Sequence, residues 1–382
     1  MIPGIFDEIL GVQLFGYISF RVAMAGLTAF LLGLWWGRPT IAWLRSHRVI
    51  EDLSVSDLVP IEAARGEPSK HDTPTMGGSF LIASLLCSTV LWCRLDNVHV
   101  VLGILLTAGL AAVGFMDDFK KLTIQGCQGL STRSKMVGMT LVTLGVVGAF
   151  VTYAVITGRT GLLDLHLPLL KDIVVPLGAM GLTGIACFLA FEWLIVVGTA
   201  NAANVTDGLD GLAAGCMIIS GLTLSIFCYV AGRWDWTEYL LLPHVPSASE
   251  MAVLGGSLCG ACLGFLWFNC FPARVFMGDS GSLPIGGLLA WMALVAKQEL
   301  VLPLIAAVFF ADLASSALQF AWYRHTGGRR LFTCAPVHHG LERYGGVFRA
   351  GPAPWHEVTV TVRAWIVASV CAMAGLALLK VR

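Results

Sequence analysis

The stretch "FEWLIVVGTANAANVTDGLDGLAAG" (residues 191–215) decides the fold class, because an apolar run ends there in a polar cluster before the chain becomes apolar again. A carboxylate left in hydrocarbon is costly, so a polar cluster at membrane depth predicts a functional site. The cluster is therefore the first candidate site, provided that the apolar runs on either side of it cross a membrane.

The whole chain has the composition of a membrane protein. Of its 382 residues, 57% are hydrophobic and only 13% are charged, and the mean hydropathy is +0.79. Soluble domains carry about 25% charged residues. The formal net charge is zero, so the chain lacks the basic excess typical of nucleic-acid-binding domains. The composition predicts an integral membrane protein and no nucleic-acid partner.

Apolar runs of the roughly 20 residues that a spanning helix needs recur along the chain. They predict an all-α, polytopic membrane protein with about ten transmembrane helices, near residues 13–36, 77–95, 98–116, 136–156, 178–200, 211–231, 251–269, 282–297, 300–322 and 361–379. Partial alternation in "GRTGLLDLHLPLLKDIVV" (158–175) indicates a short hairpin between the fourth and fifth spans. The sequence has no fixed-period repeat, so we expect a single transmembrane domain over residues 1–382.

The Lys and Arg residues are distributed unevenly between the loops. With ten spans, the loops after the first, third, fifth, seventh and ninth spans share one side of the membrane, and most of the 24 Lys and Arg residues lie in them. The positive-inside rule assigns that side to the cytoplasm. The sequence therefore predicts that both termini face outward.

Five polar motifs lie in or beside loops on the predicted cytoplasmic side. They are "KHDTPTMGG" (70–78), "GFMDDFKK" (114–121), "NAANVTDGLDGLAAG" (201–215), "FMGDSGSLPIGG" (276–287) and "APVHHGLE" (335–342). Motifs so far apart can meet only where a bundle gathers its cytoplasmic helix ends. Their shared side favours one site over five unrelated loops.

Asp117 and Asp118 lie where the third span leaves the membrane. Two adjacent acids at a helix C-terminus oppose the helix macrodipole, so a cation should compensate them, either the lysines at 120 and 121 or a metal ion. Oxygen ligands of this kind suit Mg²⁺, which takes one or two carboxylates together with substrate phosphates. The alternative is solvated charge at a helix end.

Four polar residues of the opening stretch follow one another at intervals of three, namely Asn201, Asn204, Asp207 and Asp210. On a straight helix each step of three drifts about 60° around the axis, so the first and the last diverge unless the helix breaks. Gly208 and Gly211 favour such a break. The alternative is an N-cap for the next span, supplied by Thr206 or Asp207.

Glycine and serine surround Asp279 in "GDSGS", directly before the eighth span. Their backbone N–H groups are suited to hold a phosphate at a helix N-terminus, and the alternative is a turn followed by an N-cap. Phe276 is suited to stack on a base or, as for most Phe residues near a membrane, simply to pack.

Two adjacent histidines, His338 and His339, follow a proline in an arginine-containing loop. Neighbouring residues do not share a helical face, which disfavours a two-histidine metal site; anion binding or proton handling suits them better. Lys70 and Lys135 pair with a phosphate or serve as ordinary positive-inside charges. Together these residue types predict phosphoryl transfer, and their position beside lipid predicts a lipid phosphate as one substrate.

At these motifs the sequence resembles the phospho-N-acetylmuramoyl-pentapeptide transferase family, within the polyprenyl-phosphate N-acetylhexosamine-1-phosphate transferases. "TPTMGG" (73–78), "NVTDGLDGLA" (204–213), "FMGDSGSL" (276–283) and "RRLFTCAPVHH" (329–339) carry a resemblance that covers nearly the whole chain. It implies that UDP-MurNAc-pentapeptide and undecaprenyl phosphate give lipid I and UMP, with Mg²⁺. It also implies a ten-helix homodimer of the bacterial inner membrane with periplasmic termini and a cytoplasmic active site.

The motifs and the resemblance together define the expected site. We expect catalytic roles for Asp117, Asp118, Asp279, His338 and His339, with the three aspartates as metal ligands. We expect substrate-binding roles for Lys70, Thr75, Lys121, Lys135, Asn201, Asn204, Asp207, Asp210 and Phe276. By the resemblance, Asn201, Asn204 and Asp207 belong to the nucleotide pocket, with Phe276 beside the uracil.

The sequence departs from the family pattern at two places. Where the family usually has three histidines followed by Phe-Glu, this chain has Gly340 and Leu341 after the second histidine. In the ninth span, Asp312 replaces the usual glutamate. Two rival functions also stay open. A GlcNAc-1-phosphate transferase would use the same lipid with another sugar nucleotide, and a secondary transporter would place its polar site near the bilayer midplane.

Overall fold

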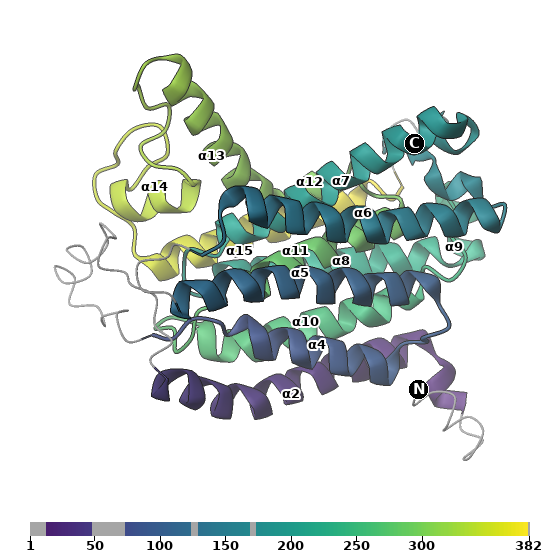
Figure 1. Ribbon diagram of the computed structural model, residues 1–382, viewed down its shortest axis with the longest axis horizontal. Coiled ribbons are helices and arrows are strands. Elements are labelled where there is room, and N and C mark those ends of the chain that lie inside the picture. The colour runs from purple at the N-terminus through teal and green to yellow at the C-terminus, as the bar shows by residue number, and fades with distance from the viewer. Residues whose placement is uncertain (1–12, 48–72, 124–128, 169–172, 381–382) are drawn as a thin grey trace.

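The computed structural model describes residues 13–47, 73–123, 129–168 and 173–380. Within them, ten helices of 15 or more residues form the bundle in Figure 1: α2 (Ile18–Ser46), α4 (Gly78–Trp92), α5 (Val98–Thr123), α6 (Thr132–Ile156), α7 (Gly181–Thr206), α8 (Leu212–Ala231), α10 (Glu250–Asn269), α11 (Asp279–Ala296), α13 (Ala307–His325) and α15 (Glu357–Ala377). The shorter helices are η1 (Gln13–Gly16), η4 (Thr160–Leu163), η5 (Leu177–Ala179), α9 (Trp234–Leu240), α12 (Leu302–Ile305) and α14 (Val337–Tyr344).

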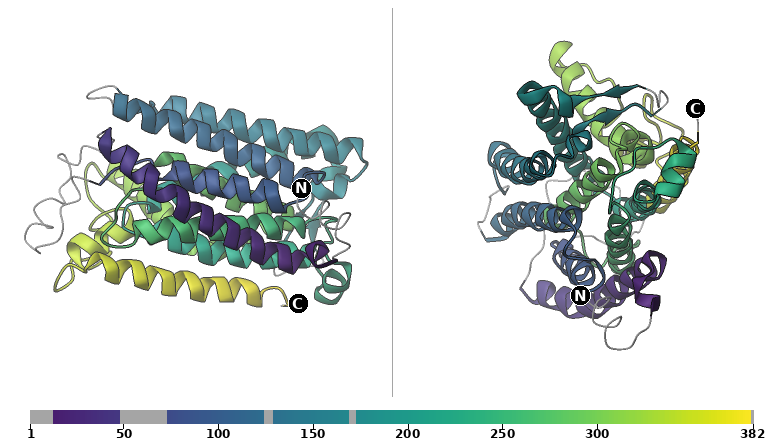
Figure 2. Two further views of the ribbon diagram at one scale, coloured as in Figure 1. Left: turned by 90° about the horizontal axis from the view of Figure 1, so that it is seen from below. Right: turned by 90° about the vertical axis from the view of Figure 1, so that its right-hand side faces the viewer.

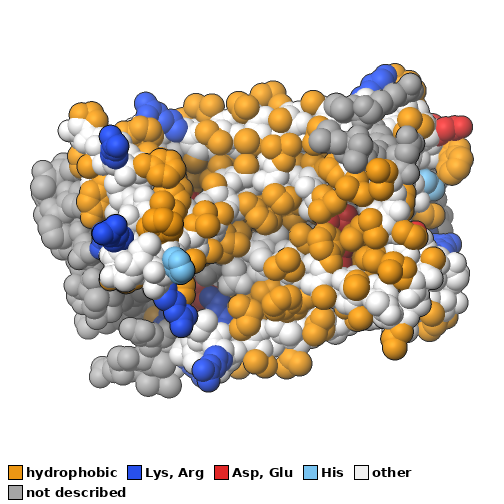
Figure 3. Space-filling model, turned by 90° about the horizontal axis from the view of Figure 1, so that it is seen from above, with side chains coloured by type: hydrophobic (Ala, Val, Ile, Leu, Met, Phe, Trp, Pro, Cys, Tyr) orange, Lys and Arg blue, Asp and Glu red, His pale blue; other side chains and the backbone are white. Residues whose placement is uncertain are grey.

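The prediction of an all-α polytopic membrane protein is confirmed. Eight of the ten helices are long and apolar enough to cross a membrane; α4 is shorter, and α13 does not meet the same criterion. Hydrophobic side chains cover the middle of the face in Figure 3, whereas Lys and Arg gather toward the ends. This distribution fits a bundle whose long axis crosses a bilayer.

The central helix of the bundle is α11, in which every residue is buried. It packs against α4, α5, α7 and α8. On the far side of α10, α2 packs closely because both helices present glycines: a Cβ on Gly33 would lie 3.2 Å from the Cα of Gly264. Small residues allow this close approach in membranes, where no hydrophobic force drives helices together.

The ninth span was predicted as one continuous helix over residues 300–322, and this prediction is wrong. The chain forms α12 and then α13, and the backbone leaves helical geometry at Ala306. Ser220 on α8 donates its hydroxyl to the carbonyl of Ile305 at 3.1 Å, so a side chain from another helix enters the ladder there. Such an insertion is a common cause of a helix break.

The predicted break in the opening stretch is confirmed. Helix α7 ends at Thr206, and Gly211 has a φ of 74°, a conformation that glycine adopts at little cost. The N-cap alternative is wrong, because α8 begins after Gly211 without a side-chain cap hydrogen bond.

One further prediction concerns the end of the bundle at which α2 begins. The expected hairpin is confirmed in the described residues, where β1 (Leu165–His166) pairs antiparallel with β2 (Val174–Val175). Helix α2 begins and α15 ends at this same end, as Figures 1 and 2 show. The loop that carries α14 lies at the other end.

Candidate active site

Two of the predicted motifs, about 200 residues apart, are joined through their backbones. The N–H groups of Gly77 and Gly78 donate to the carbonyls of Phe276 and Met277, each at 2.8 Å, and Phe276 N–H donates to the Pro74 carbonyl at 2.9 Å. This pairing sets the first turn of α4 directly against the first turn of α11.

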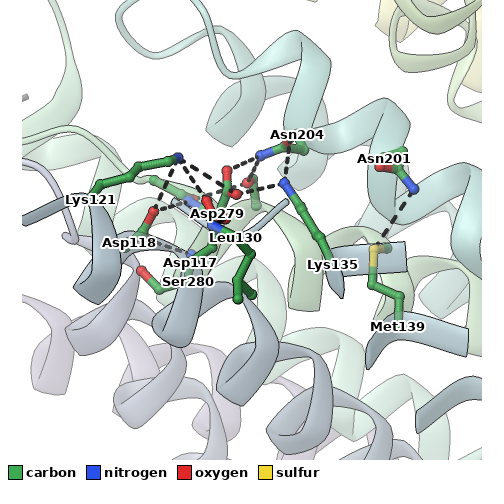
Figure 4. Close-up of polar contacts among 12 residues, drawn as sticks. Asp117, Asp118, Lys121, Leu130, Lys135, Met139, Asn201, Asn204, Asp279 and Ser280 are labelled. Atoms are coloured by element: carbon green, nitrogen blue, oxygen red, sulfur yellow. Dashed lines mark hydrogen bonds and ion pairs between the residues drawn. The ribbon is translucent and has the colours of Figure 1, made fainter. Parts of the chain in front are cut away.

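Three buried aspartates meet at the N-terminus of α11 (Figure 4). Asp117 and Asp118 come from the end of α5, and Asp279 is the first residue of α11. Each can offer one carboxylate oxygen such that the three oxygens lie within 4.8 Å of one another. No other group of three His, Cys, Asp or Glu side chains in the described residues meets this condition.

Asp118 holds the start of α11 in place. Its Oδ1 accepts the N–H of Asp279 at 3.2 Å, and its Oδ2 accepts the N–H of Ser280 at 2.9 Å. A carboxylate at a helix N-terminus satisfies otherwise unpaired N–H groups and interacts favourably with the helix dipole. Asp118 on α5 therefore caps α11 and fixes where Asp279 begins it.

Two lysines face the aspartates. Lys121, one turn after Asp117 on α5, lies 2.8 Å from Oδ2 of that residue and 3.8 Å from carboxylate oxygens of both Asp118 and Asp279. Lys135 near the start of α6 lies 2.5 Å from Oδ2 of Asp279. Their side chains remain 30% and 19% exposed, so neither lysine is sealed from solution.

Asn204 contributes the amide of the site from the last turns of α7. Its Nδ2 donates to Oδ1 of Asp279 at 2.6 Å and to the hydroxyl of Ser282 at 2.9 Å. Its Oδ1 accepts a hydrogen bond from Lys135 at 3.4 Å. Asp279 therefore receives hydrogen bonds from two other helices as well as heading its own.

The charges and geometry of the cluster fit a divalent cation. Three carboxylates and two ammonium groups leave one negative charge uncompensated among these five side chains. Oxygens bound to one Mg²⁺ lie within about 4.2 Å of one another, so the three aspartates need to close by less than about 1 Å. Hard oxygen donors are the ligands that Mg²⁺ prefers.

Several predicted residues lie away from the aspartates. The amide of Asn201 donates to the Val197 carbonyl of its own helix α7 at 2.7 Å, and it lies 3.9 Å from the Met139 sulfur of α6 (Figure 4). Asp210 is 3% exposed, and its carboxylate accepts the N–H of Ala273 at 2.9 Å, which ties down the turn after α7.

The structure also places three other predicted substrate-binding residues. Thr75 is buried beside Gly278 and Asp118, since a Cβ on that glycine would lie 3.2 Å from the Thr75 hydroxyl. Phe276 is half-buried in the joined segment, and Asp207 is half-exposed at the C-cap of α7. Lys70 lies outside the described residues.

The two histidines lie on α14, and each Nδ1 faces a carboxylate. His338 Nδ1 is 2.9 Å from Oδ2 of Asp312 on α13, and His339 Nδ1 is 3.0 Å from Oε2 of Glu342. Both Nε2 atoms point at Gly208, just after α7. Burial lowers the pKa of His339 below its ordinary range, against the opposing effect of Glu342, and this favours the neutral imidazole.

Gly340 does not face Gly208 as the two histidines do. A Cβ there would lie 3.1 Å from the Thr333 hydroxyl and 3.2 Å from the Cys334 carbonyl, within the loop before α14. A third histidine side chain would therefore leave its helix toward that loop and not toward Gly208. Asp312, the other departure from the family pattern, keeps a carboxylate on His338.

Sequence reasoning missed groups that act through the backbone or through packing. The N–H of Leu130 donates to Oδ1 of Asp117 at 2.7 Å, and Gly129 before it has a φ of 92°. Gly278 has a φ of 72°. Glycine was the available signal at both positions, because the left-handed region favours it.

The fold and the site define a class of protein. It is a polytopic helical membrane protein with an acidic site, flanked by lysines, at one end of its central helix. Residues 100–297 match the family model described as Glycosyl transferase family 4. The chain is 38% identical over 374 residues to the phospho-N-acetylmuramoyl-pentapeptide-transferase of Neisseria gonorrhoeae, and 38% identical over 371 residues to the protein of that name from Ruegeria pomeroyi. Each alignment covers 97% of this chain and 96% of the relative. The chain therefore belongs to the phospho-N-acetylmuramoyl-pentapeptide transferase family, as its motifs predicted.

Proposed function

We propose that this protein transfers phospho-MurNAc-pentapeptide from UDP-MurNAc-pentapeptide to undecaprenyl phosphate, giving lipid I and UMP. The observation that carries the proposal is the cluster at the N-terminus of α11, where three aspartates, two lysines and an asparagine meet. Family membership supports the choice of substrates, because the relatives bear the name of this transferase.

The proposed reaction forms one P–O bond and breaks another. An oxygen of the lipid phosphate attacks the phosphorus that carries the sugar, and the bond from that phosphorus to the bridging oxygen breaks, so UMP leaves with the bridging oxygen. Such transfers depend mainly on positioning and charge neutralisation. Lys121 and Lys135 supply positive charge at this place, and their exposure leaves them accessible to phosphates.

Mg²⁺ is the cofactor we assign to Asp117, Asp118 and Asp279, where it would neutralise charge on the transferring phosphates. Asn204 and Lys135 orient the Asp279 carboxylate through hydrogen bonds. Asp118 keeps α11 in register by accepting two of its N–H groups. Asp117 is held by the Leu130 N–H, which leaves its Oδ2 toward Lys121.

We assign most of the other predicted residues to substrate binding around this centre. Asp207 at the C-cap of α7 and His339 of α14 belong to the donor side, and His338 lies beside them at Gly208. Thr75 and Phe276 line the joined segment next to Gly278. We also assign Lys70 to phosphate binding. Asn201 and Asp210 support α7 and the turn that follows it, through the contacts described above.

We also propose the location, the orientation and the oligomeric state of the enzyme. We place it in the bacterial inner membrane as a single domain over residues 1–382, with the site on the cytoplasmic face and both termini in the periplasm. The positive-inside distribution supports this orientation. A homodimer is the proposed assembly. Against a transporter, the cluster lies at helix ends and not near the middle of the bundle.

The experiment is UMP release by purified protein supplied with undecaprenyl phosphate and a sugar nucleotide. We expect release with UDP-MurNAc-pentapeptide and Mg²⁺, and none after chelation. Release with UDP-GlcNAc in place of the pentapeptide donor would assign the chain to the GlcNAc-1-phosphate branch. Absence of release with either donor, from protein shown to be folded, would overturn the proposal.

A further inference from the structure

The histidine motif contains one buried nitrogen that has no hydrogen-bond partner among the described residues. This is Nε2 of His338, a residue that is only 4% exposed. The opposite edge of the ring is fixed, because Oδ2 of Asp312 lies 2.9 Å from Nδ1. The ring therefore has one set position, with α13 behind it and Nε2 directed away from α13.

A glycine, Gly208, lies in front of that nitrogen. A Cβ on Gly208 would lie 2.6 Å from Nε2 of His338 and 3.1 Å from Nε2 of His339. Gly208 is not among the glycines with positive φ. Its lack of a side chain is therefore required by this contact and not by its backbone conformation.

The two histidines differ in access. The side chain of His339 is 19% exposed, whereas that of His338 is 4% exposed with Nε2 covered by the turn. Their rings lie 4.4 Å apart. His339 can meet a substrate from solution, but His338 can reach one only through the turn at residues 207–208.

The turn connects to the metal-binding cluster through α7. Asp207 is the C-cap of that helix, and Asn204, which bonds Asp279, lies three residues earlier, in its last turn. A shift of the turn moves the end of α7 and with it the carboxylate of Asp207. A brace behind Gly208 therefore sets the position of a group on the donor side of the site.

We propose that His338, held by Asp312, is a positioning residue that braces the turn after α7, and that Gly208 is required because the imidazole occupies the space of its side chain. The proposal deepens the proposed function and rests on it for the assignment of Asp207 to the donor side. His338 acts through the turn, whereas His339 is the histidine that faces substrate.

A double-mutant cycle tests the contact. In Gly208→Ala the new methyl group collides with the imidazole, so the turn shifts. We expect the KM for UDP-MurNAc-pentapeptide to rise by about tenfold, within the range of coupling between residues in contact, while kcat stays within about twofold. A general loss of structure would instead reduce the fraction of active enzyme and so lower the apparent kcat.

The second and third variants complete the cycle. In His338→Ala the 2.6 Å contact is removed and only the longer 3.1 Å contact with His339 remains, so adding Gly208→Ala should raise KM little further. Gly198→Ala is the control, because Gly198 lies on α7, the helix that the turn at Gly208 follows, and its Cβ would meet no heavy atom within 4 Å. If Gly208→Ala behaves like Gly198→Ala, or if the two effects are additive in the double variant, the brace does not exist.

Thermal unfolding of the same four variants separates this proposal from the function on which it rests. We expect Gly208→Ala to lower Tm in the wild-type background and to lower it much less in the His338→Ala background. This result does not depend on any substrate. If no variant and no wild-type protein releases UMP, the proposed function fails, while the Tm cycle still supports or overturns the contact.

Discussion

Buried carboxylates gather at both ends of α11, with different surroundings. At the N-terminal end, Asp117, Asp118 and Asp279 meet two lysines. At the C-terminal end, Glu192 of α7 and Glu299 lie with Lys297, whose Nζ is 3.5 Å from Oε1 of Glu299. The two clusters share residue types and burial, so composition alone does not tell them apart.

Hydrogen bonding and access distinguish the two clusters. The aspartates accept N–H groups from Leu130, Asp279 and Ser280, and the lysines beside them are partly exposed. In contrast, no N–H group or hydroxyl of the described residues donates to Glu192; its carboxyl interacts with the carboxyl of Glu299, and its side chain is fully buried. Only the first cluster can exchange ions and phosphates with solution.

A buried charge cluster therefore indicates a site only when it is both preorganised and open to solution. Lys297 neutralises one carboxyl of the second cluster, so one proton shared between Glu192 and Glu299 makes that cluster neutral. Neutrality is what a sealed environment requires. The first cluster keeps an uncompensated negative charge, as the proposed Mg²⁺ site requires.

The largest expected effect is the loss of turnover in Asp279→Asn. The change removes a carboxylate from the centre of the first cluster while keeping its shape, so we expect the rate of UMP release to fall by at least about a hundredfold, as when one preorganised charged or polar group is lost from an active site. The matched change in the second cluster, Glu192→Gln, should leave the rate unchanged. Equal losses in both would break the distinction between the clusters.

The next largest effect falls on stability at the second cluster. Lys297→Met removes its cation, so two buried carboxyls face each other without compensation. Breaking a buried pair in this way costs about 3–5 kcal/mol, and we expect a large fall in Tm with an unchanged KM in the protein that remains folded. An unchanged Tm would show that the lysine does not neutralise these acids.

A smaller effect follows from the capping role of Asp118. Asp118→Asn keeps one acceptor oxygen but loses the negative charge at the N-terminus of α11. We expect a loss of about 1 kcal/mol in the free energy of unfolding, together with weaker activity because Asp279 begins that helix. The discriminating comparison is Asp96→Asn on an exposed loop, which should change neither Tm nor activity.

The smallest effect is expected for Glu192→Gln on stability. An amide can replace the protonated carboxyl of the shared pair, so the change in the free energy of unfolding should stay within about 1 kcal/mol. Glu192→Ala removes the hydrogen-bonding group and leaves space, and it should cost more. If the glutamine variant is as unstable as the alanine variant, the pair does not share a proton.

The sequence predicts which aspartates form the first cluster better than it predicts the residues around them. Asp117, Asp118 and Asp279 were predicted because their motifs, with three others, fall on the same predicted side of the membrane. The spacing of three residues also pointed to Asp210, but the turn at Gly211 directs its carboxylate to the Ala273 N–H. Spacing along a helix says nothing about side chains beyond the residue where the helix ends.

Other features depend on partners that no local pattern reveals. The cap of α11 comes from α5, and the break before α13 involves Ser220 of α8. The second cluster was not predicted because Glu192 is a single charge in an apolar run, more than 100 residues from Lys297. Such contacts are set by packing between helices and not by periodicity within one.

The most direct test of the account is binding of Mn²⁺, as a paramagnetic substitute for Mg²⁺, measured by electron paramagnetic resonance on the purified protein. We predict one site per chain in the wild-type protein, loss of that site in Asp279→Asn, and full retention in Glu192→Gln. Retention of Mn²⁺ in Asp279→Asn, or its loss in Glu192→Gln, would contradict the assignment of the metal to the N-terminal end of α11.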